Sequence, residues 1–334
     1  MVDPTIISRR TLFFVPLALA ACKDRTNILE VTGMTMGTSY SIVAVDRDGT
    51  LSRTKLQGAV DAVLADVNAQ MSNWDTGSEV SRFNAAGTET FTVSPAFAAV
   101  MAAANEVKGL SDGHFDVTTG PLIDAWGFGA AANVETMPSE AEITLAKGEM
   151  GDILVTPNTL QKTKPGTQVY LSAIGKGYGV DAVGEAIAAL GVSDFMVEIG
   201  GDLLTAGVNP DGNAWQIGIE SPTALSGVQQ VVGVTGMGLA TSGDYRNYFE
   251  RNGERYSHIL DAETGRPITH TTASATVLTE NAMLADAWAT AMLILGSETG
   301  LELADALEMA VLFIDRDGDE FTTRESAAYT ALTA

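Results

Sequence analysis

Apolar side chains recur at steps of three and four residues in the first third of the chain. Between about residues 52 and 71 these positions are Leu56, Val60, Val63, Leu64, Val67 and Met71. That spacing places them on one side of an amphipathic helix. The segment "SNWDTGSEVSRFNAAG" after it has the composition of a loop. Ser94 and Pro95 then predict a second helix that runs to about Leu110, because serine caps helices and proline is tolerated in the first turn.

Other segments alternate polar and apolar residues, which is the pattern of half-buried strands. Examples are "NILEVTGMTMGTSYSIVAV", "DFMVEIGGDLLTAG", "AWQIGIESP" and "QQVVGVTGMGLATSGDY". The segment "QVYLSAIGKGYGVDAVGEAIAALG" predicts a strand, a glycine-rich turn and a helix that ends at Gly191. Neither a fixed repeat nor a linker divides the chain. We therefore expect a single α+β domain with helices packed on a large mixed, mostly antiparallel sheet.

The segment from Glu280 to Gly296, "ENAMLADAWATAMLILG", predicts an alanine-rich helix with two polar positions one turn apart. Asp286 and Thr290 are separated by four residues and share one face of that helix. A polar helix face is one interpretation of the pair. The other is half of a metal site, since a carboxylate and a hydroxyl are hard oxygen ligands of the kind that Mg²⁺ prefers.

The motif "SAIGKGYG", residues 172–179, raises a similar choice. A glycine-rich turn before a helix exposes backbone N–H groups that suit phosphate. The spacing fits neither the dinucleotide fingerprint, because Val180 stands at the third glycine position, nor a Walker motif, because Gly177 follows Lys176. A tight turn that packs the helix on the sheet remains one interpretation. Lys176 favours the other, since a cation beside exposed amides is a phosphate partner.

Aromatic and histidine residues in predicted loops are further candidates for ligand contact. His114, Phe115 and Asp116 follow one another, and Trp74 lies in an earlier loop; such mixed loops can hold a planar ring. His258 precedes an Asp-x-x-Thr-Gly turn and suits a base or a hydrogen-bond donor. Each of these residues has a purely structural interpretation as well. With three histidines in the chain, a histidine zinc site is not expected.

Charge and cysteine content narrow the classes of function. The formal net charge of -23 argues against binding to nucleic acid, which requires a basic surface. An anionic ligand would therefore depend on local donors and a bound cation. The single cysteine, Cys22, excludes a disulfide within the chain and a multi-cysteine metal site.

The N-terminus has the features of a targeting segment. Arg9 and Arg10 precede an apolar run that ends in small residues before Cys22. "SRRTLF" resembles a twin-arginine export signal and "LAAC" resembles a bacterial lipobox. We expect an export signal over residues 1–21, a linker over 22–31 that starts at a lipidated Cys22, and the functional domain over 32–334. The protein would then be lipid-anchored on the periplasmic side of a bacterial membrane.

An ordered series of motifs resembles the ApbE-type FAD:protein FMN transferases. The motifs are "TMGTSY", "MSNWDTGSEVSRFN", "DGHFDVTTGPLIDAWGFG", "LSAIGKGYGVD", "EIGGDLLTAG", "ATSGDYRNYF", "YSHILDAETGRPI" and "NAMLADAWATAM". They extend from about Thr32 to about Ile314. The resemblance implies a Mg²⁺-dependent enzyme that cleaves FAD, transfers FMN to a Thr or Ser hydroxyl of a partner and releases AMP. The partner would be an exported or membrane protein, such as a redox-complex subunit.

The resemblance also implies roles for individual residues. The implied FAD contacts are Met36, Trp74, His114, Phe115, Asp116, Lys176 and Ile259. The implied Mg²⁺ ligands are the Ala173 carbonyl, Asp286 and Thr290. His258 and Asp286 would assist attack by the acceptor hydroxyl. Tyr170 and Ala289 depart from the family pattern, because many members have Asp at the first position and some have an acidic metal ligand at the second.

Two alternative functions would use the same predicted FAD site. Hydrolysis of FAD to FMN and AMP would replace the acceptor hydroxyl by water. A non-catalytic FAD-binding lipoprotein would hold the nucleotide unchanged. No internal nucleophile is required in any case, which agrees with Cys22 being the only cysteine of the chain.

Overall fold

The structure is a computed structural model that describes residues 26–129, 137–222, 227–245, 247–251, 254–318 and 320–334. Its described helices are α1 (Arg53–Met71), α2 (Glu79–Ala85), α3 (Pro95–Leu110), α4 (Gly120–Ala125), α5 (Glu140–Glu149), α6 (Gly175–Ala189), α7 (Ala282–Ala306) and α8 (Ala327–Thr333). The predicted export signal and Cys22 lie outside the described residues. None of the described helices has the length and apolar composition needed to traverse a bilayer.

One eight-stranded sheet, in the order β1-β2-β6-β7-β10-β15-β16-β17, forms the centre of the fold. Its strands are β1 (Asn27–Thr35), β2 (Thr38–Asp46), β6 (Asp194–Ile199), β7 (Asp202–Ala206), β10 (Gly238–Gly243), β15 (Thr272–Thr279), β16 (Ala310–Asp317) and β17 (Glu320–Glu325). Each neighbouring pair is antiparallel. The predicted α+β class is confirmed.

Smaller strands form separate sheets beside the large one. They are β3 (Phe91–Thr92), β4 (Ile153–Thr156), β5 (Thr159–Lys162), β8 (Trp215–Glu220), β9 (Val228–Val234), β11 (Tyr248–Arg251), β12 (Glu254–Ser257), β13 (Leu260–Asp261) and β14 (Arg266–Pro267). The β8–β9 hairpin and α8 contribute Ile217, Val232 and Tyr329 to a core with Leu312 and Leu278 of the large sheet. They therefore cover one face of that sheet.

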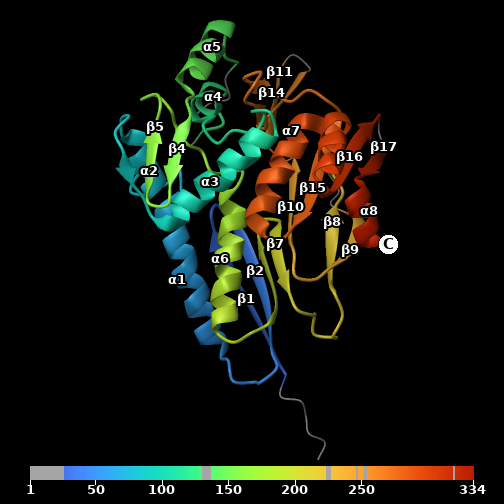
Figure 1. Ribbon diagram of the computed structural model, residues 1–334. Helices are drawn as coiled ribbons and strands as arrows, with labels where there is room; N and C mark the ends of the chain where they lie inside the picture. Colours follow the sequence, from blue (N-terminus) through green and yellow to red (C-terminus); the bar gives the residue numbers. More distant parts are fainter. Residues whose placement is uncertain (1–25, 130–136, 223–226, 246, 252–253, 319) are drawn as a thin grey trace, which may run out of the picture.

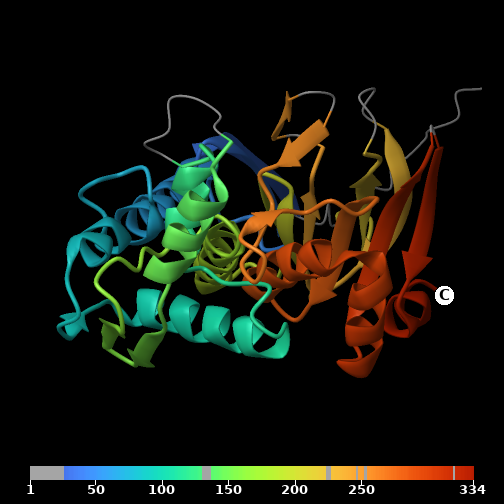
Figure 2. The ribbon, with the colours of Figure 1, turned by 90° about the horizontal axis from the view of Figure 1, so that it is seen from above.

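Helices cover the opposite face (Figures 1 and 2). α6 and α7 pack against each other and on the strands, and α1 packs on α6. Successive residues of β16 point to the two sides, so Val311 and Phe313 join the helical core while Leu312 and Ile314 join the other. Because both faces are covered, β15 and β16 are buried along most of their length.

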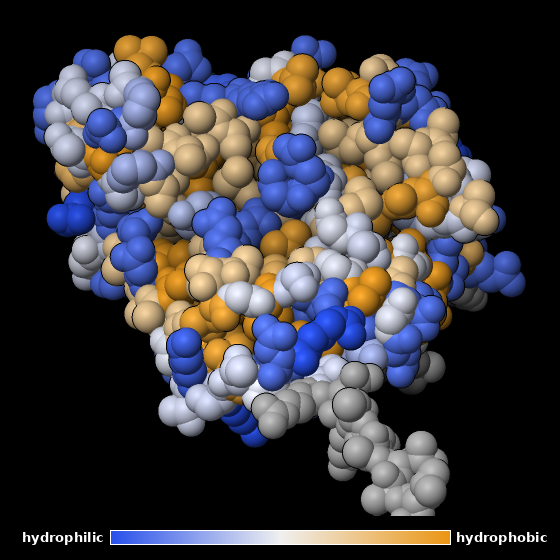
Figure 3. Space-filling view, turned by 60° about the horizontal axis from the view of Figure 1, so that its bottom comes forward, coloured by the Kyte–Doolittle hydropathy of each residue, from blue (hydrophilic) through white to orange (hydrophobic). Residues whose placement is uncertain are grey.

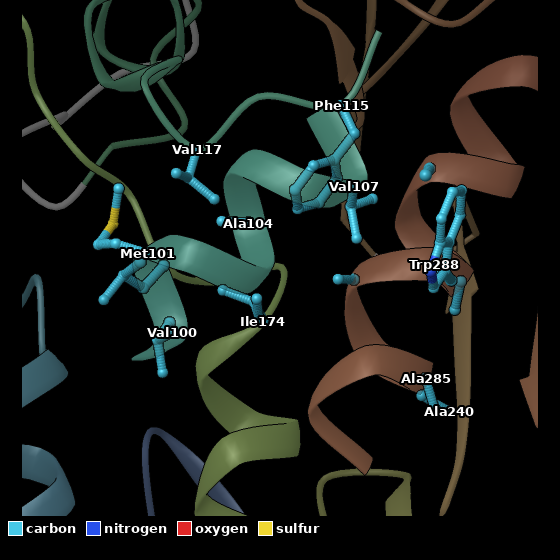
Figure 4. Close-up of a cluster of buried hydrophobic side chains, with 14 of the residues drawn as sticks. Val100, Met101, Ala104, Val107, Phe115, Val117, Ile174, Ala240, Ala285 and Trp288 are labelled. Carbon is cyan, nitrogen blue, oxygen red and sulfur yellow. The ribbon is translucent and has the colours of Figure 1, made fainter. Parts of the chain in front are cut away.

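Figure 4 shows how the loop before α4 enters this core. Phe115 and Val107 belong to one buried cluster with Trp288 of α7, and Ile174, at the start of α6, lies below Ala104 of α3. Phe115 is 2% exposed. Core packing therefore fixes the loop that carries the His114–Asp116 motif. On the outer face drawn in Figure 3, hydrophilic and hydrophobic side chains are interspersed.

Several local predictions differ from the structure. The segment interpreted as a loop after Met71 contains α2, which Ser78 caps and which buries Val80 and Phe83. The strand expected before the glycine motif is a single parallel bridge between Thr119 and Gln168. Residues 172–174 of the motif form a turn, but its glycines, Gly175, Gly177 and Gly179, lie inside α6 and not in that turn. The predicted helices 52–71 and 94–110 are confirmed.

The last long helix continues beyond its predicted end at Gly296. It runs to Ala306 with a kink at Gly296, whose φ of 74° suits glycine. A Cβ at that position would also lie 3.0 Å from the His270 ring. The glycine therefore bends the helix one turn and a half after Thr290 and does not terminate it.

Candidate functional site

A cavity of about 580 Å³ is lined by residues of α1, α6 and α7, of the strands β7, β8 and β10, and of the loops around them. This volume is in the range of small-molecule sites. Ten of the predicted site residues line it: Met36, Trp74, Phe115, Asp116, Ala173, Lys176, His258, Ile259, Asp286 and Thr290. Segments that are far apart in the sequence thus contribute to one site.

His114 is the predicted contact that does not line this cavity. Its Nδ1 lies 2.9 Å from a carboxylate oxygen of Asp261, and its backbone carbonyl accepts from Ala262 N. These contacts hold the loop against the β13–β14 turn. The proposed contact between His114 and FAD stays a prediction.

Lys176, Asp202 and Asp286 form what we term the carboxylate–lysine cluster. Lys176 Nζ lies 2.5 Å from Asp202 Oδ2 and 3.3 Å from Asp286 Oδ1. Both aspartates are 2% exposed. Burial would lower the pKa of Lys176, but the two carboxylates offset it and hold that pKa above its ordinary value. The lysine is therefore a permanent cation at the cavity wall.

Burial and the neighbouring charge of Asp286 raise the pKa of Asp202 well above its ordinary value, and Lys176 opposes this shift. Asp202 is not among the residues predicted from sequence. It follows the Gly200-Gly201 turn, and its partner is 26 residues earlier in the chain, so local pattern gives no sign of the contact. A carboxylate directly after a glycine turn at a strand start was the available signal.

Oxygen atoms suited to Mg²⁺ gather beside this cluster. Thr290 Oγ1 lies 2.9 Å from Ser242 Oγ, and Ala173 is also part of the cavity wall. The 3.3 Å contact shows that Lys176 holds Asp286 Oδ1 more weakly than it holds Asp202. Within the described ranges no three His, Cys, Asp or Glu residues form a metal cluster. The donor set therefore fits a hard cation that keeps water or phosphate ligands, as Mg²⁺ does.

The glycines of the 172–179 motif serve close packing. A Cβ at Gly177 would lie 2.2 Å from the Ala282 carbonyl oxygen, and one at Gly179 would lie 2.6 Å from Met36 Cε. The amides of Gly175 and Gly177 donate to Leu171 O and Asp286 Oδ2. Since protein acceptors already take these two amides, the packing interpretation accounts for the glycines. The phosphate role of Lys176 stays a prediction.

His258 follows β12 and lines the cavity. Its Nδ1 lies 2.8 Å from the Asn247 carbonyl oxygen. A carbonyl can only accept, so Nδ1 carries the proton and Nε2 has a free lone pair. Burial lowers the pKa of His258, against the opposing effects of the Asn247 hydrogen bond and Asp244. The ring is thus neutral at pH 7 and suited to accept a proton at Nε2.

Three aromatic residues of loops form what we term the aromatic wall: Trp74, Phe115 and Tyr170. Trp74 is 69% exposed, whereas Tyr170 is half-buried, and burial together with the charge of Asp124 raises its pKa. The Asn73 side chain accepts from Leu171 N at 2.9 Å and donates to Val169 O at 2.8 Å. Asn73, which sequence reasoning did not single out, therefore ties the Trp74 loop to the Tyr170 segment.

The remaining cavity residues have defined positions. Met36 occupies the β1–β2 turn with a φ of 49°, and its side chain reaches α6 at Gly179. Asp116 pairs with Lys108 at 2.9 Å and accepts from Thr118 N at 2.8 Å. Ala289, the second departure from the family pattern, is fully buried in the helical core and contributes no oxygen ligand from its side chain.

Comparison with known proteins gives consistent matches in both sequence and fold. The model of the ApbE family matches residues 36–313. FAD:protein FMN transferases of Haemophilus influenzae and Vibrio cholerae are each 40% identical, over 95% and 94% of this chain and 95% of their own length. The structure named flavin transferase ApbE from Vibrio cholerae superposes with a TM-score of 0.85 at 38% identity, covering 92% of this chain and 99% of that one. The apo Pseudomonas stutzeri flavinyl transferase ApbE gives 0.86 at 37% identity, with 92% and 97% covered.

Proposed function

The chain belongs to the ApbE family and is an FAD:protein FMN transferase, and from this premise we propose how its site acts. We propose that it requires Mg²⁺, transfers FMN to a Thr or Ser hydroxyl of a partner protein and releases AMP. The observation that carries this proposal is the carboxylate–lysine cluster, which places a cation and buried oxygen donors at the wall of a nucleotide-sized cavity.

The reaction breaks the phosphoanhydride linkage of FAD and forms a phosphate ester with the acceptor hydroxyl. The acceptor Oγ forms a bond to the phosphorus of the FMN half, the bond from that phosphorus to the bridging oxygen breaks, and AMP leaves with that oxygen. The hydroxyl proton moves to His258 Nε2, which is unprotonated for the reason given above. Phosphoryl transfer depends chiefly on positioning and on neutralised charge.

Lys176 supplies a permanent positive charge for the phosphates. Asp286 and Thr290 of α7, with the Ala173 carbonyl, are the residues that would hold Mg²⁺. Bound there, the ion would neutralise charge on the diphosphate. The aromatic wall and Ile259 supply apolar surface for the rings of FAD. Asp286 is thereby assigned to the cation and His258 to the proton.

We also propose that the partner is exported or membrane-bound and that this protein is anchored beside it through Cys22. The support is the N-terminal sequence alone. Cys22→Ser is expected to release the protein from the membrane fraction without a change in flavin transfer by the purified enzyme. Retention of that variant in the membrane fraction would contradict the anchor.

Mass spectrometry of an acceptor co-expressed with the enzyme tests the function. We expect a mass gain of one FMN less one water on a single Thr or Ser, and none when that residue is replaced by alanine. AMP should appear in equal amount. Release of FMN and AMP without an adduct would instead identify an FAD pyrophosphatase, and unchanged FAD would identify a binding protein.

A further inference from the structure

Two carboxylates join the N-terminal ends of α6 and α7 in a reciprocal way. Asp286 of α7 accepts from Gly177 N of α6 through Oδ2 at 3.0 Å. Asp181 of α6 accepts from Ala282 N through Oδ1 at 2.8 Å and from Met283 N through Oδ2 at 2.9 Å. Each helix thus provides an anionic partner for the first-turn amides of the other, where the helix dipole favours negative charge.

The contact made by Asp181 is additional to the ordinary cap of α7. Asn281 is the N-cap residue, and its side chain accepts from Leu284 N at 2.9 Å. Asp181 satisfies the two preceding amides from a helix about a hundred residues earlier in the chain. Its hydrogen bonds therefore connect two elements, while those of Asn281 act within one.

Backbone contact leaves little freedom at this junction. A Cβ at Gly177 would lie 2.2 Å from the Ala282 carbonyl oxygen and 2.7 Å from Met283 Cα. The first turns of α6 and α7 therefore touch directly, with no side chain between them. A shift of one helix along the other would break both hydrogen bonds of Asp181 together with the contact at Gly177.

These helices carry the charged part of the proposed site. Lys176 is in the first turn of α6, and Asp286 and Thr290 follow one and two turns after the start of α7. We propose that Asp181 is a positioning residue that fixes α7 against α6 and thereby sets the spacing between Lys176 and the oxygen donors of α7. This inference rests on the proposed function, because the spacing between Lys176 and the α7 oxygen donors matters only if those donors bind the cation.

Asp181 occupies an unfavourable position for a carboxylate. Burial raises its pKa to about 6, the Ala282 and Met283 amides oppose this, and Glu185 raises it further. A side chain whose only task was packing would not need a charge there. The hydrogen bonds from the Ala282 and Met283 amides are the feature of the surroundings that favours the ionised form of Asp181.

Asp181→Ala and Asn281→Ala are a matched pair of variants for the test. Both variants remove hydrogen bonds from the first turn of α7. Only Asp181→Ala removes hydrogen bonds that connect α7 to α6. The measurements are the Mg²⁺ concentration for half-maximal FMN transfer and, independently of activity, Mn²⁺ binding followed by electron paramagnetic resonance in the presence of FAD.

We expect Asp181→Ala to weaken Mn²⁺ binding and to raise the half-maximal Mg²⁺ concentration by ~10-fold, as for other groups that orient metal ligands. The maximal rate at saturating Mg²⁺ should largely recover. Asn281→Ala should change either value by less than about twofold. If Asp181→Ala does not fold, Asp181→Asn, which retains one acceptor oxygen, should give a smaller shift in the same direction.

Equal shifts in the two alanine variants, or no shift in Asp181→Ala, would overturn the inference. The two levels of the account fail in different ways. If the unmodified enzyme forms no FMN adduct, the proposed function fails. If the unmodified enzyme forms the adduct and the Asp181 variants bind Mn²⁺ as tightly as the unmodified enzyme, only the role of Asp181 fails.

Discussion

The carboxylate–lysine cluster and the aromatic wall line the same cavity but are built differently. Lys176, Asp202 and Asp286 come from helices and a strand start, and both aspartates are 2% exposed. The aromatic wall comes from loops, and its Trp74 is 69% exposed. The rigid part suits charges that must be held in place during reaction, whereas the loop part suits contact with a ring. Loss of the Asp286 carboxylate should therefore lower kcat, loss of the Lys176 charge should weaken FAD binding, and changes in the aromatic wall should raise KM.

The largest effect is expected for Asp286→Asn. It keeps the size of the side chain and an acceptor for Gly177 N, but it removes the anionic donor to the cation. We expect kcat to fall about 10³-fold, with the melting temperature and most FAD binding retained. Single-turnover transfer to an acceptor, beside FAD fluorescence titration, measures both. A normal kcat would remove the cluster from the chemistry.

His258→Gln should lower kcat about 10²-fold, because glutamine cannot accept the proton of the acceptor hydroxyl. His270→Gln is the control, since His270 is not among the cavity-lining residues. In the unmodified enzyme, kcat should rise with pH through the lowered pKa of His258 and stay level above about 6.5, because the base must be neutral. A rate that falls over this range would show that His258 acts as an acid.

Lys176→Met should weaken FAD binding by about 10-fold, because a charge-assisted hydrogen bond to phosphate is lost. The same change should lower the melting temperature, because Asp202 and Asp286 then lose the cation between them. Isothermal titration and thermal unfolding report the two effects. An unchanged dissociation constant for FAD would contradict the phosphate role.

Trp74→Ala should have the smallest effect, a rise of about fivefold in KM for FAD with kcat unchanged, since stacking contributes about 1 kcal/mol. Because Trp74 is 69% exposed, stability should not change. Leu145→Ala, at an exposed position outside the cavity wall, serves as the control. A change confined to kcat would contradict the assignment of the aromatic wall to FAD binding.

Sequence pattern predicted those features that depend on local spacing. The four-residue step from Asp286 to Thr290 gave a shared helix face, and both side chains line the cavity. Helix α2 was missed because its composition resembles a loop, although Ser78 followed by Val80 and Phe83 was a usable signal. Both are short-range features.

Long-range contacts could not be predicted in the same way. The pairing of Lys176 with Asp202 and the bonds from Asp181 to α7 join distant segments, and no spacing in the sequence encodes them. The glycines of α6 were also ambiguous from sequence alone. Gly177 and Gly179 are required because Ala282 and Met36 approach α6 closely. This approach exists only once the helices are packed.

The most direct test of the central claim is anomalous diffraction from crystals of the enzyme grown with FAD and Mn²⁺. We expect a Mn²⁺ peak about 2.1 Å from Asp286 Oδ and Thr290 Oγ1, with the FAD diphosphate beside Lys176, and no such peak in Asp286→Asn. A Mn²⁺ peak elsewhere in the cavity, or FAD bound with its diphosphate away from Lys176, would contradict the proposed cation site.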